Sequence, residues 1–584
     1  MALFTPSESP AVVVKEVDLT SGVPNVQSST GAFVGNFAFG PVEQPVLISN
    51  EAELAETFGS PTADSNRSSV DFISAAQFLR YSNSLQVVRM ADESSRNAGF
   101  IASDSGGATQ AQRISNKAAF DALSFASVDS NRNTFISRHI GSVGNSLRVS
   151  VLDSAGDSAF NSWTYRAEFD AAVGTSSYAS ARGGSNDEMH VIVIDQNGLL
   201  TGTAGTVLER YPFVSKASDA KNPDGSTNFV KDVINERSEY IYMANGDSDM
   251  KQANFGQTAA NKDFKREIKV HTNFDLSGGV SSQVLDSSKF AAGFDLFEDK
   301  DKIEVDFLIA PGGLNRDTHT TIVNDLISIA QNTRKDCVVV ASPARSDVVG
   351  LTDAATITSN IVTTANGITK SSYLVMDGNY LKVYDKFKDQ FVEIPAASST
   401  AGIMAATDRN AAPWFSPAGG RRGQYLGVTG VNYSPSKAQR DTLYKAGVNP
   451  VANIPGQGLV LFGDKTGLGR PSAFDRINVR RLFLVLERAI SRAAENVLFE
   501  FNDEFTRAEF VNIVEPVLRE VKGRRGITDF RVVCDESNNT AAVIDRNEFI
   551  ANIFIKPARS INYITLNFVA VRTGVEFEEV TGLV

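Results

Sequence analysis

The spacing of hydrophobic and polar residues changes several times along this 584-residue chain, and each change marks an expected domain. Across residues 272–436 we expect strands in "KIEVDFLIA", "DCVVVASP" and "SYLVM", and helices over "HTTIVNDLISIAQN" and "DAATITSNIVTTA". Apolar strands that alternate with helices predict a parallel sheet with right-handed crossovers. A strand–helix–strand pattern over residues 22–92 predicts a second segment of the same α/β middle domain.

Residues 93–271 have a different pattern. They are rich in Ser, Gly, Asp and Asn, and short alternating runs such as "LRVSVLD" and "MHVIVID" are separated by polar loops. This pattern is typical of half-buried strands joined by exposed connections. We therefore expect a β-rich outer domain that tolerates variation.

Residues 437–573 predict an α+β C-terminal core domain, with helices first and antiparallel strands after them. The strongest helical signal lies in "SAFDRINVRRLFLVLERAISRAAENVLFEF". At 100° per residue, seven apolar positions fall within an arc of about 100°: Val479, Leu482, Phe483, Leu486, Ile490, Ala493 and Val497. Arg481, Arg488 and Arg492 align within about 40° on the opposite side.

A second C-terminal helix is expected to begin at "TRAE", where Thr506 and Glu509 have the spacing of a capping box. Pro516 in its middle predicts a kink or a break. Strands follow in "FRVVCD" and in an alternating run that ends at Pro557.

Both ends of the chain carry a strand pattern with no local partner. The first arm, residues 1–21, contains "AVVVKEV" with Val12, Val13, Val14 and Val17. The last arm, residues 574–584, contains "VEFEEV", in which Val575 and Phe577 alternate with glutamates. Gly22 and Gly574 are the expected hinges of these arms, because glycine gives the backbone local freedom.

Composition limits the classes of function. The length predicts two to four domains, and the sequence lacks both an apolar stretch long enough for a membrane helix and a signal peptide, so we expect no membrane insertion and synthesis in a cytoplasm. Cys337 and Cys534 are expected to be reduced thiols within strands. A net charge of −12 argues against nucleic acid as a direct partner.

Candidate chemistry is sparse. The four histidines (His139, His190, His271 and His319) have no metal-site spacing, and no CxxC motif or phosphate-binding loop occurs. The segments "GDKTGLG" and "SPAGGRRGQ" are expected to be loops, the second with an anion site as a weaker alternative. We therefore expect no catalytic residue, cofactor or metal, and an α/β enzyme is a remote alternative.

Two interpretations of the arginine stripe remain open. Like charges that align over three turns repel each other unless an acidic partner is present. In the first interpretation, the stripe faces another protein. In the second, it faces solvent or pairs with acidic groups of its own chain.

Several segments in the same order resemble the tail sheath proteins of contractile-tailed, T-even-type bacteriophages. They are "DCVVVASPARSDVVG", "WFSPAGGRRGQ", "AQRDTLYKAGVNPV", "VLFGDKT", "SAFDRINVRRLF", "FRVVCDESNNT", "VIDRNEFIA" and "KPARSINYITLNFVA", with "GNFAFGPVEQP", "NEAELAETFGSPT" and "FLRYSNSLQVVR" near the start. The match in order covers about two thirds of the chain, and residues 93–270 do not share it.

The resemblance implies a structural role in a phage tail, assembled in the host cytoplasm and incorporated in the virion. Such subunits stack as hexameric rings around an inner tail tube, between baseplate and tail terminator proteins, and contract to drive the tube through the host cell envelope. It also implies that both arms donate strands to neighbouring subunits and that the C-terminal domain faces the tube, which makes Arg481, Arg488 and Arg492 candidate tube contacts. The alternative is that the chain forms the sheath of a tailocin or of a type VI-like contractile injection system.

Overall fold

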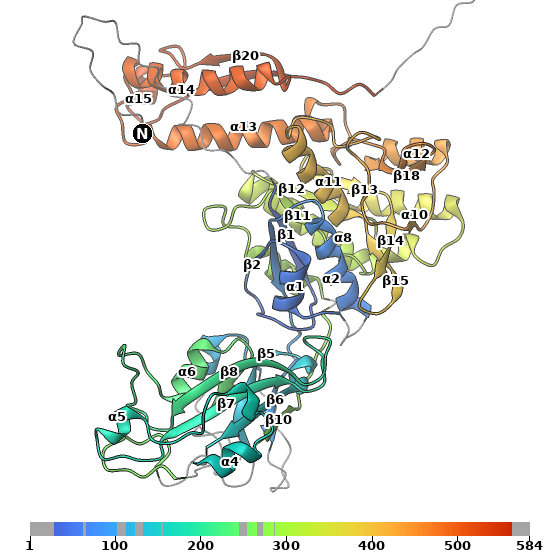
Figure 1. Ribbon diagram of the computed structural model, residues 1–584. Helices are drawn as coiled ribbons and strands as arrows, with labels where there is room; N and C mark the ends of the chain where they lie inside the picture. The colour runs from blue at the N-terminus through green and yellow to red at the C-terminus, as the bar shows by residue number, and fades with distance from the viewer. Residues whose placement is uncertain are drawn as a thin grey trace, which may run out of the picture.

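The computed structural model describes residues 29–61, 66–101, 113–122, 132–153, 156–244, 254–265, 273–284 and 286–562. Three bodies lie in a row in Figure 1. A β-rich body occupies one end, an α/β body lies in the centre, and the C-terminal helices and strands form the other end. This arrangement confirms the predicted fold class of α/β and α+β units with a β-rich insertion.

The central body is built on a seven-stranded sheet. Neighbouring strands are parallel except for β2, which runs antiparallel to β3 at one edge. In spatial order the strands are β17 (Val448–Asn449), β13 (Leu374–Asp377), β12 (Val338–Ala341), β11 (Phe307–Ile309), β1 (Gly31–Gly35), β3 (Leu85–Arg89) and β2 (Val46–Ile48). The predicted parallel sheet is therefore confirmed, with segments from both sides of the insertion.

Alternate residues of each strand point to opposite sides of this sheet. Both faces are apolar, and helices cover both of them. Phe33 of β1 belongs to one buried cluster, whereas Ala32 and Val34 belong to the other. The first cluster includes side chains of α1 (Glu51–Phe58), α2 (Asn66–Leu79) and α11 (Ala397–Asn410). The second includes side chains of α7 (Ser287–Asp295), α8 (Arg316–Ser328), α10 (Ala354–Gly367) and α12 (Lys437–Lys445).

Smaller elements complete the central body. A single turn of helix, α9, spans Arg345–Val348, and a π-helical turn, Ile329–Arg334, extends α8. The small antiparallel strands are β14 (Tyr380–Asp385), β15 (Gln390–Pro395), β16 (Gly430–Val431), β18 (Val451–Ile454) and β19 (Gly458–Leu461). β17 and α12 belong to the predicted C-terminal segment 437–573, but they pack with the central sheet: Asn449 pairs with Asp377 of β13, and Leu443 joins the second cluster.

The β-rich body is a seven-stranded sheet in which all neighbours are antiparallel. Its strands, in spatial order, are β8 (Thr206–Ser215), β7 (Glu188–Asp195), β6 (Leu147–Leu152), β10 (Asn273–Ser277), β4 (Asn97–Ile101), β5 (Arg132–Ile140) and β9 (Ile241–Met243). Its helices are α3 (Lys117–Ala122), α4 (Asp157–Ser162), α5 (Ser177–Ser180) and α6 (Val230–Arg237). The predicted β-rich character of residues 93–271 is confirmed.

One buried arginine joins the β-rich body to the central body. Arg89, at the end of β3, donates to the carbonyls of Phe37 at 2.8 Å and Gly40 at 2.8 Å in the central body. It also donates to the carbonyl of Ile140 at the end of β5, at 2.7 Å. Burial and the neighbouring guanidiniums of Arg89 and Arg138 lower the pKa of His139 to about 3, so the imidazole at this junction is neutral.

The C-terminal body consists of two long helices and a strand pair around their own apolar cluster. The elements are α13 (Ile477–Glu495), α14 (Glu504–Gly523), β20 (Ile527–Val533), α15 (Ala541–Ile544) and β21 (Asn552–Pro557). Both long helices form where they were predicted, but α13 is shorter than its predicted segment at both ends, and α14 begins earlier than predicted. Asp503 caps it by accepting from the amide of Thr506 at 2.8 Å, so Thr506 is a helical residue and not the cap. The helix also continues through Pro516 without a break.

Candidate assembly surfaces of the C-terminal body

Strands β20 and β21 pair with each other, and within the described part of the chain they pair with no third strand. One face of the pair packs on α14, where Val532, Ile553 and Ile555 join the apolar cluster. The opposite face is open, and Phe554 there is 60% exposed. A two-stranded sheet is marginal by itself, and each outer edge carries a row of main-chain donors and acceptors. Among the described residues, the pair therefore has two outer edges to which a further strand could bind.

The predicted arm residues lie outside the described residues. These are Val12, Val13, Val14, Val17 and Gly22 at one end of the chain, and Gly574, Val575 and Phe577 at the other. Their assignment as intersubunit strands and hinges stays a prediction.

The last described residues are held by a buried carboxylate, Asp464. The Ser560 hydroxyl donates to Oδ2 of Asp464 at 2.7 Å, and the Asn562 amide donates to Oδ1 at 3.1 Å. Arg476 pairs with the same Oδ1 at 2.8 Å, and the Tyr444 hydroxyl donates to it at 3.1 Å. The chain that leads to the C-terminal arm is therefore fixed to the segment that follows the β18–β19 hairpin.

The charge of Asp464 is stabilised by these contacts. Burial would raise the pKa of its carboxyl, but hydrogen bonds from Ser560 and Asn562 and the charge of Arg476 hold the pKa below its ordinary value. Asp464 therefore stays ionised at neutral pH and keeps all of its acceptor sites.

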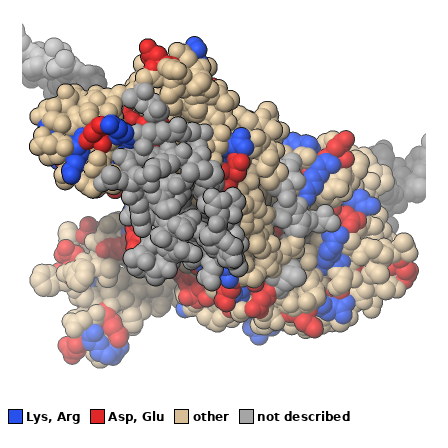
Figure 2. Space-filling view, turned by 90° about the horizontal axis from the view of Figure 1, so that it is seen from below, with Lys and Arg blue, Asp and Glu red and all other residues tan. Residues whose placement is uncertain are grey.

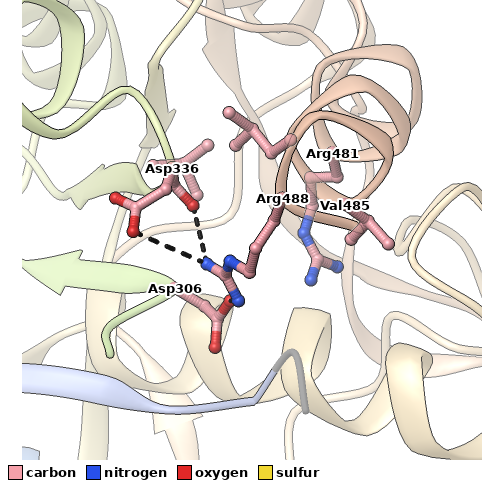
Figure 3. Close-up of a pocket in the computed structure, with 7 residues that line it drawn as sticks. Asp306, Asp336, Arg481, Val485 and Arg488 are labelled. Carbon is pink, nitrogen blue, oxygen red and sulfur yellow. Dashed lines mark hydrogen bonds and ion pairs between the residues drawn. The ribbon is translucent and has the colours of Figure 1, made fainter. Parts of the chain in front are cut away.

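The arginine face of α13 packs on the central body. Arg488 Nη1 lies 2.7 Å from Oδ1 of Asp306, the residue before β11, and Arg488 Nη2 donates to the carbonyl of Asp336 at 2.9 Å (Figure 3). Asp306 also accepts from the amide of Thr30, next to β1, at 3.0 Å. Burial raises the pKa of the Asp306 carboxyl, while the Arg488 guanidinium opposes that rise. One carboxylate thus connects α13 with the starts of two sheet strands.

The other two arginines of the stripe are paired as well. Arg481 pairs with Asp408, and its guanidinium lies 4.9 Å from the centre of the Phe307 ring. Its side chain is only 5% exposed, whereas Arg492 pairs with Glu304 in a more exposed position. Arg481 and Arg488 are therefore buried in pairs within the chain, so the structure shows the intramolecular pairing that the sequence left open. A contact between a tube and the more exposed Arg492 stays a prediction.

The position of α13 between two cores explains this burial. Leu482 and Leu486 join the apolar cluster of the C-terminal body, and Ile477 and Leu484 join a cluster of the central body. Figure 1 shows α13 between α14 and the central sheet. A helix that packs on two sides buries its polar face together with its partners, and periodicity cannot reveal those partners.

The recess beside Arg488 is much smaller than a ligand pocket. The recess lined by Arg481, Arg488, Asp306 and Asp336 has a volume of about 10 Å³, which is close to that of one water molecule. Among the described residues, no group of three or more His, Cys, Asp or Glu side chains could hold a metal ion. No helix in the described segments is long and apolar enough to cross a membrane.

A buried polar network lies at the carboxyl ends of β12 and β13, where α/β enzymes often place their sites. Asp377 accepts from the hydroxyls of Ser342 at 2.8 Å and Thr400 at 3.0 Å, and Thr400 also contacts the Tyr425 hydroxyl. Burial raises the pKa of Asp377 to about 7. Asp377, Ser342 and Thr400 are almost inaccessible to solvent, so the network ties strands to α11 without facing a substrate.

In each of the two predicted loops, one basic side chain binds a main-chain carbonyl of the same chain. Arg422 of "SPAGGRRGQ" donates to the carbonyl of Ser416 at 2.8 Å and lies over the Phe415 ring. Lys465 of "GDKTGLG" donates to the carbonyl of Tyr444 at 3.0 Å. Both segments are loops, as predicted.

Two histidines and both cysteines lie in the protein interior. His190 and His319 are buried, with ring nitrogens 2.9 Å from the carbonyl of Ala171 and 2.8 Å from that of Ser342. Cys337 and Cys534 are buried free thiols. His271 lies outside the described residues.

One exposed surface is not predicted by the helical period of the sequence. Val497 belongs to the predicted apolar arc of α13, but the helix ends at Glu495. The turn that follows and the first turn of α14 together expose four large apolar side chains, with exposed fractions of 60% for Leu498, 103% for Phe499, 83% for Phe501 and 77% for Phe505. Large apolar side chains that gather in one exposed segment are typical of interaction surfaces. Its signal in the sequence is the run "VLFEFNDEF", in which aromatic and acidic residues alternate irregularly after the helical period stops.

Charges of both signs are interspersed on the face shown in Figure 2. The acidic and basic residues lie in small mixed groups between uncharged areas on that face. A mixed distribution of this kind lacks the continuous positive field that binds a phosphate backbone.

The chain is similar to tail sheath proteins over nearly its full length. Residues 288–467 match the family model of the phage tail sheath protein central domain, and residues 470–570 match that of the phage tail sheath C-terminal domain. The tail sheath protein of Enterobacteria phage T4 is 32% identical over 658 residues, which cover 98% of this chain and 99% of that protein. The tail sheath protein of Vibrio phage KVP40 is 30% identical and covers 98% of this chain and 99% of its own length. That of Salmonella phage ViI is 30% identical, with 99% and 98% covered.

Two solved structures have a similar fold. The sheath tail protein from Listeria innocua superposes with a TM-score of 0.55 at 12% identity, covering 93% of this chain and 94% of that one. The sheath tail protein from Desulfitobacterium hafniense gives 0.53 at 11% identity, covering 94% and 100%. At these identities the likeness concerns the fold alone.

Proposed function

The chain belongs to the phage tail sheath protein family, and from this premise we propose that it is the structural, non-enzymatic subunit of a contractile tail sheath. It stacks as hexameric rings around an inner tail tube, between baseplate and terminator proteins, and contracts to drive the tube through the host cell envelope. The observation that carries this proposal is the similarity to the T4 tail sheath protein over 98% of the chain. The virion is its place of action, after assembly in the host cytoplasm.

The open strand pair suits an assembly based on strand exchange. A neighbour's arm that adds to an edge of β20 or β21 satisfies main-chain groups that have no partner strand in the described residues. Each new hydrogen bond contributes about 0.5–1.5 kcal/mol net, against about 1–2 kcal/mol per ordered residue, so hydrogen bonds alone roughly break even. Burial of two anchors such as Val575 and Phe577 adds roughly 3–6 kcal/mol and favours the bound arm.

The contacts at the base of each arm support the transmission of force. Asp464 holds Ser560 and Asn562, and Arg488 holds the C-terminal body against Asp306 of the central sheet. A pull on the arm therefore acts on the fixed body of the subunit. Gly574 lies 12 residues beyond Asn562, so the proposed hinge is distal to this anchor.

Assembly of the purified full-length chain tests the proposed function. Sedimentation and negative-stain electron microscopy are expected to show polymers of regular width. A uniform population of monomers under conditions that include the tail tube protein would contradict the proposal.

A further inference from the structure

The exposed turn between α13 and α14 has a second property besides its apolar side chains. Within residues 493–509, five acidic side chains are exposed, and the basic residue Arg507 is buried. The exposed acids are Glu495, Glu500, Asp503, Glu504 and Glu509. We call this surface, with Leu498, Phe499, Phe501 and Phe505, the acidic aromatic end.

The opposite end of α14 has the complementary charge. Six basic side chains are exposed on the last turns of α14, on the loop that follows and on the end of the strand pair: Arg519, Lys522, Arg524, Arg525, Lys556 and Arg559. Three carboxylates lie among them and form partial ion pairs: Glu515 with Arg519, Asp529 with Lys522 and Glu520 with Arg524. The surplus of positive charge remains, and we call this surface the basic end.

The two ends lie at opposite poles of one rigid element. α14 has 20 residues, which corresponds to a length of about 30 Å. In Figure 1 the turn after α13 lies beside α15, whereas the C-terminal end of α14 lies toward the opposite side. One copy therefore cannot bring its own two ends together.

We propose that the acidic aromatic end of one subunit docks on the basic end of a second copy of this chain. Head-to-tail contacts of this kind are heterologous, and they generate closed rings or helices rather than isolated dimers. The inference rests on the proposed sheath function and identifies a contact between C-terminal bodies in addition to the exchanged arms.

The chemistry of the two ends supports a copy as the occupant. Cationic side chains bind aromatic faces, and their aliphatic stems cover apolar surface. This chain already uses the same contact internally: Arg480 lies 4.3 Å from the Tyr373 ring centre and 4.2 Å from that of Phe474, and Arg524 lies over the Trp414 ring. Ile561, which is 82% exposed, follows Arg559 and adds an apolar side chain close to the basic end.

Cysteine cross-linking of assembled full-length protein tests this contact. Asn496→Cys places a thiol beside the acidic aromatic end, and Gly523→Cys places one at the basic end, where an added Cβ has no atom within 4 Å. Neither substitution alters a charge. The native thiols of Cys337 and Cys534 are buried, so a bismaleimide should react mainly with the new ones. Thr333→Cys, an exposed position on the central body, is the matched control.

We expect a covalent dimer in tubes assembled from a mixture of the two single variants, and its loss when either variant is used alone or when Thr333→Cys replaces Asn496→Cys. Tubes in which Asn496→Cys cross-links to itself, to the tail tube protein or to nothing would overturn the inference and leave the sheath function standing. Failure of the unsubstituted chain to form tubes would instead contradict the proposed function.

Discussion

Arg488 and Asp306 form a buried ion pair, with Nη1 and Oδ1 2.7 Å apart, that joins α13 to the start of β11. Replacement of Arg488 by Met leaves the carboxylate of Asp306 without its charged partner. Loss of one partner of a buried pair costs about 3–5 kcal/mol, so the free energy of unfolding should fall by that order in denaturant titrations.

Arg492→Met is the matched control, because the Arg492–Glu304 pair is more exposed. Its cost should be about 0–1 kcal/mol. Equal effects of the two substitutions, or a loss of tube binding without loss of stability in Arg488→Met, would restore the tube-facing interpretation of the stripe.

Asp464→Asn should loosen the last described residues. The amide cannot accept from Ser560, Asn562 and Arg476 together, so amide hydrogen exchange at 560–562 should accelerate. Asp475→Asn removes a weaker contact to the same arginine, at 3.5 Å, and serves as the control. Unchanged exchange in Asp464→Asn would show that the anchor does not hold this segment.

The same anchor should respond to acid. The pKa of Asp464 is below its ordinary value in the folded chain, so its contribution to stability is present above the unfolded pKa and is lost as the pH falls through the folded value. Exchange at 560–562 should therefore rise in the unsubstituted protein only at acidic pH.

Asp377 predicts the opposite dependence. Its pKa is raised to about 7, so the neutral carboxyl is the favoured buried form and stability declines as the pH rises from the unfolded pKa, about 4, to about 7. Asp377→Asn cannot ionise and should reduce the decline in unfolding temperature between pH 5 and pH 8. An identical pH profile in the variant would exclude Asp377 as its source.

The parallel sheet was predictable because its strands are buried on both faces and appear as apolar runs such as "CVVVA". The destination of Arg481 and Arg488 was not, because a helical period gives the residues that share a face but not the body that covers it. Asp306 precedes Arg488 by 182 positions, and Asp408 precedes Arg481 by 73. The cap of α14 was misplaced because Thr506 and Asp503 are both good capping residues, and tertiary packing buries Thr506.

Electron microscopy of three chains tests the central claim most directly: the full-length protein, a chain that begins at Gly22 and a chain that ends at Thr573. The account predicts long tubes of regular width from the full-length chain, and folded subunits with short or no tubes from both truncated chains, because each lacks one donated strand. Long contractile tubes from either truncated chain would contradict the claim that exchanged arms link the subunits.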